Sequence, residues 1–100
     1  MITPELMKIF NEAVKDAIGN IPAVSMGFKG TGLDLKKYVE NEMDFYLGVT
    51  IATIQERWMY LAIDKKMFID DVRSAIPYII ISIYEMIPKL KEEIKSRLGL

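Results

Sequence analysis

The 100-residue sequence contains no cysteine and no histidine. Without cysteine the chain has no disulfide framework, no thiolate nucleophile and no Cys-ligated zinc or iron–sulfur site. Without histidine it lacks the side chain most used for acid–base catalysis near neutral pH and the commonest ligand of transition metals. Several familiar classes of enzyme are therefore excluded, and we expect a non-enzymatic protein without a cofactor.

The sequence also lacks an excess of either charge, with 13 Lys and Arg residues against 14 Asp and Glu residues and a formal net charge of -1. No overall positive field attracts a phosphate backbone, which disfavours nucleic-acid binding. The uncharged run at residues 74–84 contains Pro77 and is shorter than the roughly 20 residues of a membrane span. We interpret this run as buried core and expect no membrane partner.

The first residues, Met-Ile-Thr-Pro-Glu, do not resemble a secretory signal, which leaves the cytoplasm as the expected location. Usage rich in Ile, Lys and Glu, with a single Gln, is compatible with a heat-adapted organism. The apolar fraction of 51% is sufficient for a hydrophobic core, and the length indicates one domain over residues 1–100.

Apolar residues recur at helical spacing through most of the chain, which predicts an all-α fold. Thr3 and Pro4 indicate the start of a helix over residues 4–18, and Gly19 indicates its end. Residues 19–33 hold four of the six glycines and Pro22, and we predict one irregular loop there.

Asp34 is a candidate N-cap for a long helix over residues 34–64, apolar on two sides and therefore central. Two further helices are predicted over residues 68–87 and 88–98. Pro77 and Pro88 each remove a helical hydrogen bond, so this half is expected to be either kinked or divided. The expected architecture is a small bundle of three to five helices.

A glycine-rich segment precedes the predicted helix at residue 34. Backbone N–H groups at a helix N-terminus can bind an anion, so this segment is a candidate phosphate site, although a plain flexible connection is the alternative. The spacing matches neither a P-loop nor a dinucleotide fingerprint. The candidate residues are Gly27, Lys29, Gly30, Thr31 and Gly32.

A polar strip along the predicted central helix is the second candidate for a ligand site. Two carboxylates, an arginine and two phenols in a partly dry cleft can bind a polar small molecule or a metal ion, as in a binding protein or a metal-dependent enzyme. Ordinary ion pairs between helices are the alternative. The strip comprises Thr53 and the candidate ligand-binding residues Glu42, Tyr46, Glu56, Arg57 and Tyr60. The pairs Glu40/Asp44 and Asp70/Asp71 are explained by the helix dipole, and we assign no metal site.

Self-association is the function that the sequence favours most, because a 100-residue monomer has limited interior for 51% apolar residues. We expect a homodimer acting as a protein-interaction module, with an interface around Trp58, Met59, Ile83 and Met86. A further alternative is nucleic-acid binding by the basic C-terminal helix. The residues concerned are Lys89, Lys91, Lys95 and Arg97.

Overall fold

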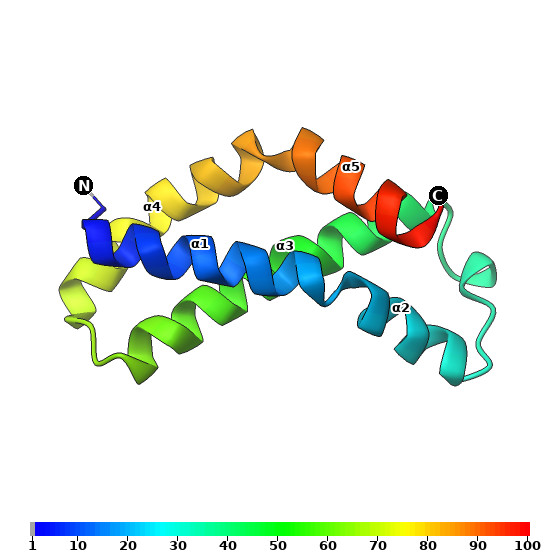
Figure 1. Cartoon of the computed structure of the whole chain (residues 1–100), viewed down its shortest axis with the longest axis horizontal. Helices are drawn as coiled ribbons and strands as arrows, with labels where there is room; N and C mark the ends of the chain where they lie inside the picture. The colour runs from blue at the N-terminus through cyan, green and yellow to red at the C-terminus, as the bar shows by residue number, and fades with distance from the viewer. Residues whose placement is uncertain (1) are drawn as a thin grey trace.

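The computed structural model describes residues 2–100, and in this range the chain forms α-helices and no β-strand (Figure 1). The all-α prediction is therefore confirmed. The elements are α1 (Pro4–Gly19), α2 (Ile21–Gly30), the short 3-10 helix η1 (Leu35–Lys37), α3 (Glu42–Asp64), α4 (Ile69–Glu85) and α5 (Ile87–Leu98).

The molecule is elongated, with extents of 43 × 25 × 20 Å, and is organised around α1 and α3. These two helices cross at the middle of the molecule, α4 and α5 form an arch along one side, and α2 extends from the end of α1 (Figure 1). Helix α3 also packs against α5 and α4, so it is central as predicted, although Ile63 on its second apolar side is 65% exposed.

The core lies where α1, α3, α4 and α5 meet. Trp58 of α3 is its largest fully buried side chain. Aliphatic side chains from all four helices surround Trp58 and exclude water from the core, and this burial is the main driving force for folding. They include Leu6, Ile9, Ile54, Ile83, Leu90 and Ile94.

The first correction concerns residues 19–33, where a loop was predicted and the structure has α2 over Ile21–Gly30. The chain bends at Asn20, whose backbone N–H still donates to carbonyls of α1. Ile21 and Ser25 are buried and Phe28 packs partly against the core, so tertiary contacts outweigh the low helix propensity of Gly27 and Gly30.

The second correction concerns the start of the central helix. Asp34 caps only η1, by accepting a hydrogen bond from the Lys36 backbone N–H at 3.2 Å. The α-helix begins at Glu42, where Asn41 Oδ1 accepts from the Asp44 backbone N–H at 3.1 Å. A second N-cap inside the apolar pattern therefore sets the boundary, because an Asn side chain competes well for the free N–H groups of a helix start.

The two prolines of the C-terminal half have different effects. Pro77 lies inside the continuous helix α4, whereas the division falls at Met86, just before Pro88 in the first turn of α5. A proline in the first turn removes an N–H that has no intrahelical partner, so Pro88 is tolerated there. The alternative of a divided C-terminal half is thus the one the structure adopts.

Candidate functional site

The glycine-rich segment closes a helix in the structure, whereas it was expected to precede one. Residues 27–30 form the last turn of α2, and the Thr31 hydroxyl donates to the Phe28 carbonyl at 2.6 Å. The end of a helix carries the negative pole of its dipole and free carbonyl groups, which disfavour an anion. Gly32, with φ of +74°, continues the turn, and Lys29 is exposed.

The polar strip is spread along most of α3. Glu42 and Glu56 are 14 residues apart in one helix, a separation of about 21 Å at 1.5 Å per residue. Glu56, Arg57 and Tyr60 are exposed, while Tyr46 is buried. One small ligand does not reach the whole strip, which divides into a buried tyrosine at one end and solvated side chains at the other.

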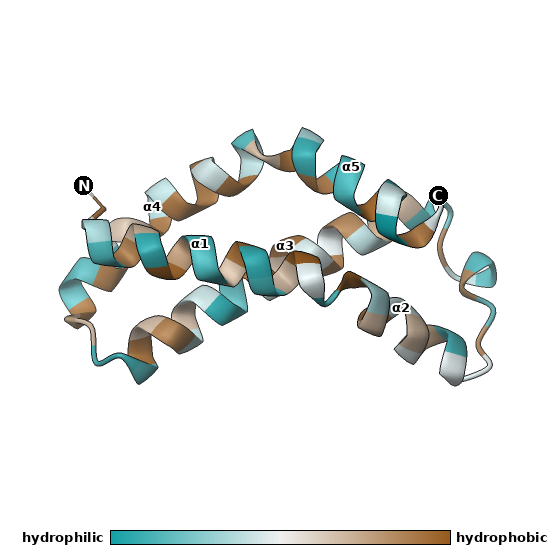
Figure 2. Ribbon diagram, viewed as in Figure 1, coloured by the Kyte–Doolittle hydropathy of each residue, from teal (hydrophilic) through white to brown (hydrophobic). Residues whose placement is uncertain are grey.

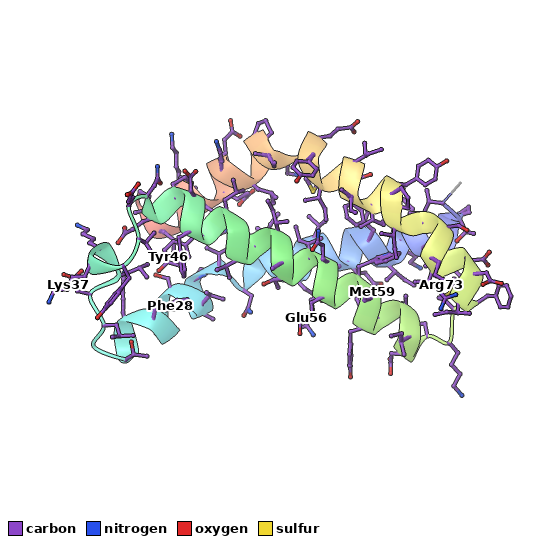
Figure 3. The ribbon with its side chains drawn as sticks, turned by 180° about the vertical axis from the view of Figure 1, so that it is seen from behind. Phe28, Lys37, Tyr46, Glu56, Met59 and Arg73 are labelled. Atoms are coloured by element: carbon purple, nitrogen blue, oxygen red, sulfur yellow. The ribbon has the colours of Figure 1, made fainter. Side chains whose placement is uncertain are left out.

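Tyr46 belongs to an aromatic cluster between α2 and α3. Its hydroxyl donates to Ser25 Oγ at 3.5 Å, and its ring packs edge-on against Phe28 and Phe45. Figure 3 shows Phe28 and Tyr46 near one another, with Glu56 further along α3. The structure therefore separates the exposed part of the strip from the glycine-rich segment instead of bringing them together.

The four residues expected at an interface fall into two groups. Trp58 and Ile83 are buried within the single chain, so they belong to the core. Met86 is half-buried at the junction of α4 and α5, and Met59 is the one member of the four that is exposed. The helical period correctly marked apolar faces, but it did not tell core residues from surface residues.

Helices α3 and α4 border an apolar cavity of about 190 Å³ that opens beside Met59. The indole Nε1 of Trp58, which lines this cavity, is buried without a hydrogen-bond partner. The lining is almost entirely hydrocarbon and offers a ligand no charged group. It consists of Gln55, Trp58, Met59, Ile76, Ile79 and Ile80.

The outward surface of α4 is the largest departure from the expected structure. Residues 74–84 were interpreted as buried core, yet Tyr78, Ile81 and Tyr84 are 46%, 55% and 67% exposed. Ser74 and Pro77 are exposed on the same side of the helix. We call these five residues the α4 outer face, and no charged side chain interrupts them. Figure 2 shows the contrast between the pale to brown turns of α4 and the largely teal outer turns of α5.

A groove of about 490 Å³ runs between α1 and α5. Unlike the cavity between α3 and α4, it is lined by charged side chains. Val14 and Ile18 of α1 contribute apolar surface, and Lys15, Lys89 and Arg97 contribute positive charge. Glu93 is the single acidic residue of the lining, and its Oε2 accepts a hydrogen bond from Arg97 Nε at 3.0 Å. Asn11, Gly19 and Met86 complete the lining.

The basic residues of α5 do not form a single cationic face. At 100° per residue, Lys91 is about 200° around the helix from Lys89. Lys89 and Arg97 therefore border the groove with α1, whereas Lys91 and Lys95 lie on another side of α5. The four basic residues named for the nucleic-acid alternative are thus divided between two sides of α5.

Comparison with protein families, with curated proteins and with solved structures found no match to this chain. Among residues 2–100, no group of three or more acidic side chains is arranged to hold a metal ion. No helix in this part of the chain has the length and hydrophobicity to cross a membrane. The surface features that bear on function are the α4 outer face, the cavity between α3 and α4, and the groove between α1 and α5.

Proposed function

We propose that this protein is a self-associating interaction module that buries the α4 outer face against a second copy. The observation that carries the proposal is the exposure of Tyr78, Ile81 and Tyr84 on a helix whose outward side bears no charge between residues 74 and 84. A surface helix ordinarily presents charged and polar residues on the side opposite the core.

Exposed apolar side chains are concentrated in this part of the molecule. Among residues 2–100, thirteen large hydrophobic side chains are exposed, of which nine lie between residues 59 and 84 and four elsewhere. Tyr78, Ile81 and Tyr84 share the outward side of α4, and burial of apolar surface is favourable by about 25 cal/mol per Å². The nine are Met59, Tyr60, Ile63, Phe68, Ile69, Tyr78, Ile80, Ile81 and Tyr84.

A second copy of the chain fits this surface for an electrostatic reason. In a two-fold symmetric dimer each surface patch meets itself, so any unpaired charge at the centre of the patch is brought toward its own copy. The α4 outer face carries no charge and meets its copy without repulsion. Its tyrosines are well suited to an interface, since each combines an apolar ring with a hydroxyl that can remain in contact with water.

Sedimentation equilibrium of the purified chain over a range of micromolar concentrations tests the proposal. The wild-type chain is expected to be a dimer or larger assembly, and Ile81→Lys is expected to raise its dissociation constant at least tenfold by placing a charge in the buried face. Glu92→Gln on exposed α5 changes the net charge by the same amount and serves as the matched control.

A wild-type chain that remains monomeric throughout this range contradicts the proposal. So does an assembly that Ile81→Lys leaves intact, because its interface then lies elsewhere. Native mass spectrometry of the same samples identifies any small molecule that copurifies. A monomer carrying such an adduct would replace self-association with ligand binding in the α3–α4 cavity.

A further inference from the structure

The groove between α1 and α5 combines an apolar floor with a net positive rim. Three basic side chains and one acidic side chain line it, so its net charge is +2, whereas the whole chain carries -1. Glu93 is already engaged by Arg97, and neither Lys15 nor Lys89 forms a salt bridge within the described residues. An occupant that matches this groove presents hydrophobic groups together with carboxylates.

The chain itself carries a surface of this kind at the start of α4. Phe68 and Ile69 are 63% and 52% exposed, and the exposed carboxylates of Asp70 and Asp71 follow directly. We call these four residues the α4 corner. The helix dipole explains the two acids, but it does not explain two large apolar side chains in water beside them.

The groove and the corner are too far apart to meet within one molecule. The turn between α3 and α4 lies at one end of the long axis, and α5 lies over the other half of the molecule (Figure 1). A contact between the groove of one copy and the corner of another joins two different surfaces. Such a contact is heterologous, and it connects copies head to tail.

We propose that the α1–α5 groove binds the α4 corner of a second copy. Phe68 and Ile69 lie against Val14 and Ile18, and the two aspartates lie beside the lysines of the rim. The contact rests on the proposed self-association and adds a second interface to it, one that links dimers formed through the α4 outer face into larger assemblies.

Complementary charge reversal tests the contact in a chain that also carries Ile81→Lys, which removes the outer-face contact. The groove variant is Lys15→Glu with Lys89→Glu, and the corner variant is Asp70→Lys with Asp71→Lys. Each is expected to be monomeric alone, whereas Ile81→Lys without them still associates weakly.

An equimolar mixture of the two variants is expected to form a mixed complex, because the unchanged groove of the corner variant meets the unchanged corner of the groove variant. The reversed groove and the reversed corner are also complementary in charge, so the mixture regains association that neither variant has alone. The complex is expected to bind at least tenfold more tightly than either variant binds itself, and to weaken with added salt. Circular dichroism establishes that each variant is helical. Phe68→Ser, which leaves the charges in place, provides a second corner variant in case lysines disturb the start of α4.

A mixture that remains monomeric overturns the contact, as does a loss of all association with Ile81→Lys alone. The two proposals fail in different ways. If the mixture forms the complex while Ile81→Lys leaves the wild-type assembly unchanged, the groove contact stands and the outer-face dimer fails. If Ile81→Lys dissociates the wild-type assembly and the mixture stays monomeric, the outer-face dimer stands alone.

Discussion

Helices α4 and α5 follow one another with only Met86 between them, and they bury the same kind of surface. Ile79 and Ile83 of α4 and Leu90 and Ile94 of α5 are all buried in one core. Their outward sides differ, because α4 presents tyrosine and isoleucine and α5 presents lysine and glutamate. The inward sides are thus equivalent, and any difference in role between the two helices lies on their surfaces.

The difference also shows what stabilises the single chain. A charged outward side such as that of α5 is solvated in the monomer and contributes little to folding, since exposed ion pairs are worth about 0–1 kcal/mol. The apolar side-chain surface on the outward side of α4 is exposed to water in the monomer, and it adds stability only when it is covered. Buried positions of α4 and α5 are therefore expected to stabilise the fold, and positions on the α4 outer face are expected to stabilise an assembly.

The largest expected effect is on the shared core. Ile83→Ala in α4 and Leu90→Ala in α5 are each expected to lower the free energy of unfolding by about 2–5 kcal/mol, through lost burial and the cavity that remains. Urea denaturation at one fixed protein concentration measures both. If only one of the two substitutions lowers the free energy of unfolding, the inward sides of α4 and α5 are not equivalent.

A smaller effect is expected at the prolines, where the two helices differ in backbone. Pro77→Ala restores a hydrogen-bond donor inside α4 and is expected to raise the free energy of unfolding by about 2 kcal/mol, after allowance for a freer unfolded chain. Pro88→Ala, in the first turn of α5, is the matched control and is expected to change it by less than about 1 kcal/mol. Thermal denaturation followed by circular dichroism distinguishes them, and equal effects would contradict the distinction.

The sequence predicted the helical class, the start of α1 at Pro4 and the central position of α3, because N-caps and the 3.6-residue period depend on local chemistry. It failed at α2, where the burial of Ile21 and Ser25 outweighs the low helix propensity of glycine, and at the start of α3, where Asn41 replaces Asp34 as the cap. Both failures arise where tertiary contacts or a second equivalent cap decide between local alternatives.

The surfaces were harder to predict than the fold. Residues 45–55 of α3 and 74–84 of α4 are uncharged runs of the same length, yet the first is largely covered by other helices and the second is not. Composition and periodicity do not distinguish these two runs, because the burial of each run depends on which other helices pack against it. Lys15 and Lys89 likewise share a groove only because α1 and α5 lie side by side.

The central claim, that the α4 outer face is covered in solution, is tested most directly by hydroxyl-radical footprinting of the tyrosines at low and high protein concentration. Tyr38 is 74% exposed near η1 and provides an internal reference. The account expects oxidation of Tyr78 and Tyr84 to fall severalfold as the concentration rises, while that of Tyr38 stays constant. Oxidation of Tyr78 and Tyr84 that stays as constant with concentration as that of Tyr38 would contradict it.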